Sequence, residues 1–106
     1  MTGRHPAWKR TETAVAALLG GERIPVSGRQ RGDQPDIRHD TLSVEVKLRG
    51  SLPGWLVDAM DQATAASRGG RIPLVVLHPK GGRHADDLCV LALADLAALV
   101  GRDGDA

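Results

Sequence analysis

The chain has 106 residues, a formal net charge of +1 and one cysteine, Cys89. This length suits a single domain over residues 1–106 and argues against a second independent core, and a lone cysteine excludes an internal disulfide. Apolar runs of only a few residues argue against a membrane span or a secretory signal, so we expect a soluble cytoplasmic protein in which Cys89 is a small buried side chain.

The first half of the chain predicts one helix and three short strands. Residues 7–19 are rich in Ala and Leu and end at a Gly-Gly pair, which predicts a helix. "ERIPV" predicts a short edge strand, because its proline cannot donate a ladder hydrogen bond, and the polar loop "SGRQRGDQ" follows. Residues 35–39 and 42–49 then predict a hairpin that turns at Asp40 and Thr41.

The second half predicts a helix, two strands and a final helix. A helix over residues 51–67 carries Pro53 in its first turn, and the continuous apolar run 72–78 predicts a strand buried on both faces. A strand, a helix and a strand in succession form a right-handed crossover, which makes 72–78 parallel to 42–49. "DLCVLAL" predicts the last strand, and "ADLAALV" predicts a C-terminal helix with Asp95 as a candidate cap.

The element order αβββαβ(βα) predicts an α/β domain with a central mixed β-sheet flanked by helices. Side chains alternate along a strand, so Glu45 and Lys47 share one face of the central strand 42–49. Such an acid-x-lysine pair usually belongs to a solvated outer face, but a central strand should be apolar on both faces. We therefore expect the pair either at the exposed end of the strand or in a functional cleft.

Asp36 begins the partner strand of the hairpin and is expected to lie across from the neighbourhood of Glu45. Two carboxylates at that distance are costly unless a cation neutralises them. Mg²⁺ typically takes one or two protein carboxylates together with water and phosphate oxygens. The pair is thus a candidate Mg²⁺ site, with two alternatives: Asp36 as a strand-start residue after Pro35, and Asp33 in the preceding loop as the ligand.

Glu12 is a third candidate acid. It falls on the stripe of the first helix that Trp8, Val15 and Leu19 otherwise turn toward the core. A carboxylate there either reaches a cleft or, if Thr11 begins the helix, lies in the first turn and interacts with the helix dipole. We favour the cleft.

Taken together, Glu12, "PVSGR", "PD" and "VEVK" resemble the PD-(D/E)xK nuclease superfamily, and most of all the archaeal-type Holliday junction resolvases. The resemblance spans roughly residues 7–78 and implies a restriction-endonuclease-like core. It implies that Asp36 and Glu45 are metal ligands, assisted by the backbone carbonyl of Val46. It also implies that Glu12 supports the metal directly or through water, and that Lys47 orients or activates the attacking water.

The resemblance implies DNA contacts as well. Ser27 matches a serine near the scissile phosphate of the resolvases, and Gln62 more loosely matches a glutamine on the second helix. From the residues themselves, Arg29 and Arg31 are either contacts to the phosphate backbone or part of a solvated basic loop. The four histidines show no metal-ligand spacing, so His5, His39, His78 and His84 are expected to be structural or surface residues.

The function expected from these residues is a Mg²⁺-dependent endonuclease, with Mn²⁺ as a substitute, that cuts branched DNA such as Holliday junctions. Two symmetric cuts in a two-fold junction require two sites, so we expect a homodimer. One alternative is a restriction-like or repair nuclease with another DNA substrate. The other is a DNA-binding module that keeps the fold without cleavage.

Overall fold

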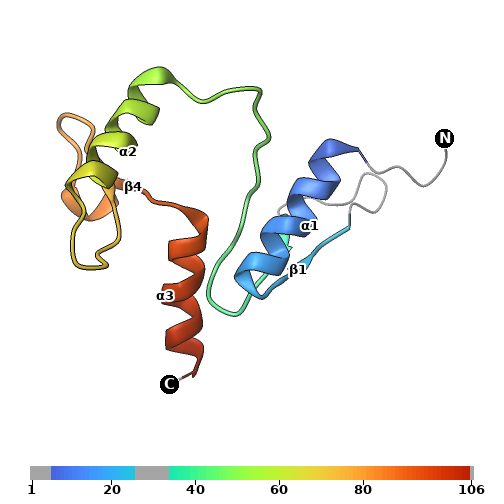
Figure 1. Cartoon of the computed structure of the whole chain (residues 1–106). Helices are drawn as coiled ribbons and strands as arrows, with labels where there is room; N and C mark the ends of the chain where they lie inside the picture. The colour runs from blue at the N-terminus through green and yellow to red at the C-terminus, as the bar shows by residue number, and fades with distance from the viewer. Residues whose placement is uncertain (1–5, 26–33, 106) are drawn as a thin grey trace. The chain divides into compact units, whose positions relative to one another are not determined.

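The computed structural model describes residues 6–25 and 34–105, with side chains through residue 101. Its elements are α1 (Ala7–Leu19), β1 (Glu22–Arg23), β2 (Ile37–Arg38), α2 (Gly54–Ala66), β3 (Val75–Leu77), the 3₁₀ helix η1 (His84–Asp86), β4 (Leu88–Val90) and α3 (Leu93–Asp105) (Figure 1). Over these residues the protein is α/β, with two two-stranded antiparallel sheets. Contacts divide it into two compact units, one up to Arg49 with Ala97 onward, the other Gly50–Leu96. The single domain over residues 1–106 stays a prediction.

The first helix has the bounds that the sequence predicts. α1 starts directly after Pro6 and ends at Gly20, whose φ of 75° is the left-handed conformation that commonly closes helices. Because α1 starts at Ala7, Thr11 lies inside it and donates its hydroxyl hydrogen to the Ala7 carbonyl at 3.0 Å. The alternative in which Thr11 begins the helix and Glu12 belongs to its first turn is therefore wrong.

β1 and β2 form an antiparallel ladder beside α1, with Arg23 opposite Ile37. Ile37 is fully buried, and Ala16 and Leu19 of α1 are the other buried apolar residues among those described. Gly21 lets the chain turn from α1 into β1, because a Cβ at this position would overlap a carbonyl oxygen of β2. This small apolar core fixes the start of β2 against α1.

The predicted strand 42–49 is reduced to one antiparallel bridge, between Val44 and Ile37. The alternation of its side chains is confirmed up to residue 47, because the inward positions are half-buried and the outward ones exposed. β2 is only two residues long, so it offers this segment little backbone to pair with. The segment therefore follows β2 closely only around Val44.

The second unit is built from α2 and a β-hairpin. α2 begins after Pro53, close to the predicted start, and packs against β3. β3 and β4 pair antiparallel, with Val75 opposite Val90 and Leu77 opposite Leu88. The connection between them holds η1 and a turn at Gly81, whose φ is +85°.

This hairpin corrects three expectations. The described strands do not form one mixed sheet, because β3 pairs with β4 and not with residues 42–49. A short connection between antiparallel neighbours loses less entropy on closing than a crossover over a helix. Val76 is 53% exposed, so the run 72–78 is not buried on both faces, and Cys89 is exposed rather than buried.

The last helix, α3, begins earlier than predicted. The first backbone bonds of α3 go to the carbonyl of Ala92, from the N–H groups of Asp95 and Leu96. Asp95 therefore lies within the first turn, where its charge interacts favourably with the helix dipole, and it does not cap the helix.

Over the residues that the structure describes, no helix combines the length and the apolar character that crossing a bilayer requires.

Candidate functional site

Asp36 directly precedes β2 and contacts both the residue after β1 and the segment 42–49. Its backbone N–H donates to the Val44 carbonyl at 2.8 Å, and its carbonyl accepts from the Ile24 N–H at 2.9 Å. Its side chain is buried, and Oδ2 accepts a hydrogen bond from the Val46 N–H at 2.6 Å. The Pro-Asp carboxylate is therefore held at the middle residue of the Glu-Val-Lys motif, as the sequence pattern predicts.

Glu45 and Lys47 lie on one face, as predicted, and this face is exposed. Their side chains are 61% and 65% exposed, and Lys47 Nζ lies 3.4 Å from Glu45 Oε2. The structure gives neither of the two expected settings: the pair follows the Val44 bridge directly and lies on the solvated outer face that such a pair usually has. An exposed ion pair of this kind contributes about 0–1 kcal/mol, so an incoming phosphate or cation can replace it at little cost.

Glu12 points inward, as its place on the stripe of α1 predicts. It is 5% exposed, and its Oε1 accepts a hydrogen bond from Arg23 Nε at 2.7 Å. The Arg23 guanidinium also lies over the Trp8 ring, 5.6 Å from its centroid. Glu12 thus pairs with a cation of the protein itself. The sequence did not predict the role of Arg23, because no characteristic spacing links it to Glu12.

The three predicted acids do not gather around one point within the described residues. Glu12, Asp36 and Glu45 form no group whose ligand atoms all lie within 4.8 Å of one another. Their chemistry nevertheless fits Mg²⁺, since two carboxylates and the Val46 carbonyl are the hard oxygen donors that this ion prefers. Binding would require Glu45 to leave Lys47 and turn toward Asp36.

The remaining predicted DNA contacts are placed only in part. Gln62 is exposed on α2, in the second unit. The residues outside the described ranges include Ser27, Arg29, Arg31 and the rival acid Asp33. A hollow of about 450 Å³ beside α1 and β1 has three cationic residues in its lining, Lys9, Arg10 and Arg23. None of the three was named as a DNA contact from the sequence.

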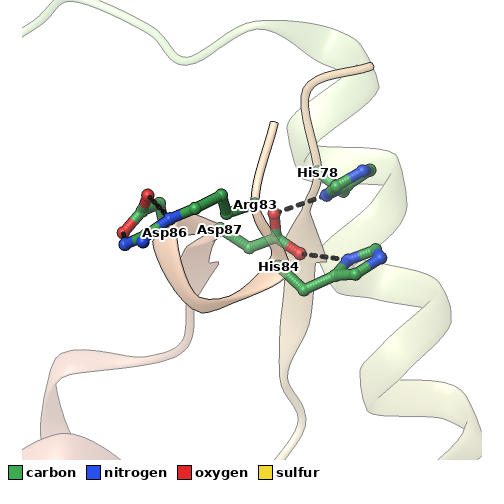
Figure 2. Close-up of polar contacts among 5 residues, drawn as sticks. All are labelled: His78, Arg83, His84, Asp86 and Asp87. Atoms are coloured by element: carbon green, nitrogen blue, oxygen red, sulfur yellow. Dashed lines mark hydrogen bonds and ion pairs between the residues drawn. The ribbon is translucent and has the colours of Figure 1, made fainter. Parts of the chain in front are cut away.

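A second polar group, in the hairpin, was missed from the sequence. The side chains of His78, His84 and Asp87 converge, with the Asp87 carboxylate directed at both imidazoles (Figure 2). His78 Nδ1 lies 2.6 Å from Asp87 Oδ1, and His84 Nδ1 lies 3.6 Å from Asp87 Oδ2. The signal in the sequence was the pair His78 and Asp87 at equal distances from the middle of a Gly-containing hairpin connection.

Comparison with protein-family models, curated proteins and solved structures found no match to this chain.

Proposed function

We propose that this chain is a metal-dependent DNA endonuclease of the PD-(D/E)xK type. The observation that carries the proposal is the 2.6 Å hydrogen bond from the Val46 N–H to Asp36 Oδ2. It holds the Pro-Asp carboxylate against the Glu-Val-Lys motif, although ten residues separate the two in sequence. An acid-x-lysine pair that only contributes to a solvated surface does not require a buried carboxylate next to it.

In this proposal Asp36, Glu45 and the Val46 carbonyl would hold Mg²⁺ or Mn²⁺. The bound ion supplies charge neutralisation at the phosphate and a more acidic water molecule. Lys47 leaves its ion pair with Glu45 and contacts a phosphoryl oxygen of the DNA. It stabilises the negative charge that develops on that oxygen. The low energy of the exposed Glu45–Lys47 pair is what makes this exchange inexpensive.

The reaction is hydrolysis of a phosphodiester. A water oxygen forms the new bond to phosphorus, the bond to the leaving deoxyribose oxygen breaks, and a proton returns to that oxygen. Lys47 orients the attacking water from the exposed face of the segment. Glu12 is the helix acid of the motif, and through Arg23 it fixes α1 to β1 beside Asp36.

DNA binding in this proposal uses cations of the first unit, including those between β1 and β2 in sequence. Lys9 and Arg10 line the hollow on α1, and contacts from such residues to phosphates add affinity without reading sequence. In this proposal Ser27, Arg29 and Arg31 contact the strand near the cut, and Gln62, which belongs to the second unit, contacts another part of the DNA. A homodimer acting on branched DNA places two such sites for paired cuts.

A second candidate function is a DNA-binding module without cleavage. It is favoured by the ion pairs of this site, since Glu12 contacts Arg23 and Glu45 contacts Lys47. These contacts also form in a protein that has no metal to bind.

The experiment that separates the two is cleavage of a labelled four-way junction, beside a matched linear duplex and a single strand. We expect paired nicks on the junction with Mg²⁺ or Mn²⁺, and none with EDTA. Cleavage of linear DNA instead of the junction would support a nuclease with a different DNA substrate. Metal-independent binding with no cutting of any substrate would establish the binding module.

A further inference from the structure

The hairpin of the second unit brings His78 and Asp87 together by its register. Val75, Val76 and Leu77 pair with Val90, Cys89 and Leu88, so His78 and Asp87 are the next pair of opposite residues. The turn between them is tight, because a Cβ on Gly82 would approach Pro79 to 3.3 Å. This places His78 and Asp87 at the mouth of the connection, one from each strand end.

The 3₁₀ helix η1 supplies the third group. η1 begins at His84, whose ring stacks on that of His78 with centroids 4.1 Å apart and an interplanar angle of 24°. The neighbouring acid, Asp86, is turned away and accepts two hydrogen bonds from the Arg83 guanidinium, at 3.0 and 3.2 Å. Figure 2 shows this pair on the other side of Asp87 from the two imidazoles. Asp87 is therefore the acid that faces both histidines.

The distances suit a small transition-metal ion. The ligand atoms of the three side chains all lie within 4.8 Å of one another, with Asp87 oxygens 2.6 and 3.6 Å from imidazole nitrogens. Ligands of tetrahedral Zn²⁺ lie about 3.3–3.6 Å apart, given metal–ligand bonds of about 2.0–2.2 Å. The separation of His84 from Asp87 already lies at the upper end of this range, and that of His78 from Asp87 is shorter, so a small movement of the His78 or Asp87 side chain makes room for the ion.

We propose that His78, His84 and Asp87 bind a divalent transition-metal ion, Zn²⁺ in the first place, that links the two ends of the hairpin. Two imidazoles and a carboxylate select such an ion over Mg²⁺, which prefers oxygen ligands. Three protein ligands leave a fourth position for water, and the 85% exposure of the His84 side chain keeps this position open to solvent. This site is separate from the one at Asp36 and does not depend on it.

The site has a natural matched control. Asp87→Asn and His84→Ala each remove one ligand, while Asp86→Asn changes an adjacent exposed acid that faces Arg83. The His84 side chain is 85% exposed, so its replacement removes the stack on His78 and little other packing. Circular dichroism of each variant checks that the chain is folded before binding is compared.

The test is competition for Zn²⁺ against a chromophoric chelator, with the full chain carrying no histidine tag and with excess Mg²⁺ to occupy sites made of oxygen ligands alone. We expect one ion per chain, and a loss of affinity of at least about 100-fold in Asp87→Asn and in His84→Ala, since even groups that only orient a ligand contribute about 10–100-fold. Asp86→Asn should bind as the wild type does.

NMR of the ¹⁵N-labelled chain provides a second readout, which identifies the ligand side chains. The imidazole nitrogen signals of His78 and His84 should shift on addition of Zn²⁺, while those of His39 in the first unit stay in place. No Zn²⁺ binding by the folded wild type, or binding as tight as that of the wild type in Asp87→Asn and His84→Ala, would overturn the proposal and leave the group as a histidine–aspartate ion pair.

Discussion

Replacing Asp36 with Asn is expected to lower the rate of DNA cleavage by at least about 1,000-fold, because the charge that a hard cation requires is removed from the site. The substitution keeps the shape of the side chain, and the amide oxygen still accepts the hydrogen bond from the Val46 N–H. Folding and DNA binding should therefore persist. The measurement is single-turnover cleavage of a labelled junction with saturating protein.

Asp40→Asn is the matched control for this prediction. Asp40 lies four residues later, in the turn before residue 42, and is exposed. Its replacement removes the same charge from the same hairpin and should leave cleavage unchanged. Cleavage by Asp36→Asn at the wild-type rate would show that the nuclease site lies elsewhere, and equal losses in both variants would indicate a general effect of charge on DNA binding.

Replacing Glu12 with Ala is expected to lower the free energy of unfolding by about 3 kcal/mol. Glu12 is buried, and its removal leaves the Arg23 side chain, which is 20% exposed, without the carboxylate that neutralises its charge. Loss of one partner from a buried ion pair costs about 3–5 kcal/mol, and the partial exposure of Arg23 places the effect at the lower end. Urea unfolding followed by circular dichroism measures the change.

The ion pair between Glu22 and Arg38 provides the comparison. Its two side chains are 77% and 71% exposed at a distance of 3.2 Å, so Glu22→Ala should change the free energy of unfolding by about 0–1 kcal/mol. In the double variant Glu12→Ala with Arg23→Ala, much of the loss should be recovered, because no unpaired charge remains. Equal effects of Glu12→Ala and Glu22→Ala would mean that Glu12 is not buried in the folded protein.

The helices were predictable because their ends are marked in the sequence. Gly20 supplies the left-handed residue that closes α1, and Pro53 marks the start of α2. The sheet was not predictable in the same way. The run 72–78 is equally compatible with a buried parallel strand and with one arm of a hairpin, and the choice depends on which partner is nearest in the chain.

The same distinction holds for the candidate site. The shared face of Glu45 and Lys47 follows from the period of an extended segment, so the sequence alone predicts it. The Glu12–Arg23 contact joins a helix to a strand across 11 residues, and no local pattern encodes it. The histidine–aspartate group depends on the register of the β3–β4 hairpin, and the only signal of it in the sequence is the position of His78 and Asp87 at the two ends of the connection.

The most direct test of the proposed nuclease site is to add Mn²⁺ to the ¹⁵N-labelled chain, with and without the Asp36→Asn substitution. A paramagnetic ion broadens the signals of nearby amides. We predict selective broadening at Asp36, Glu45 and Val46 in the wild type and its loss in Asp36→Asn. Unaffected signals at these residues, or the same broadening in both proteins, would contradict a metal site at the Pro-Asp and Glu-Val-Lys motif.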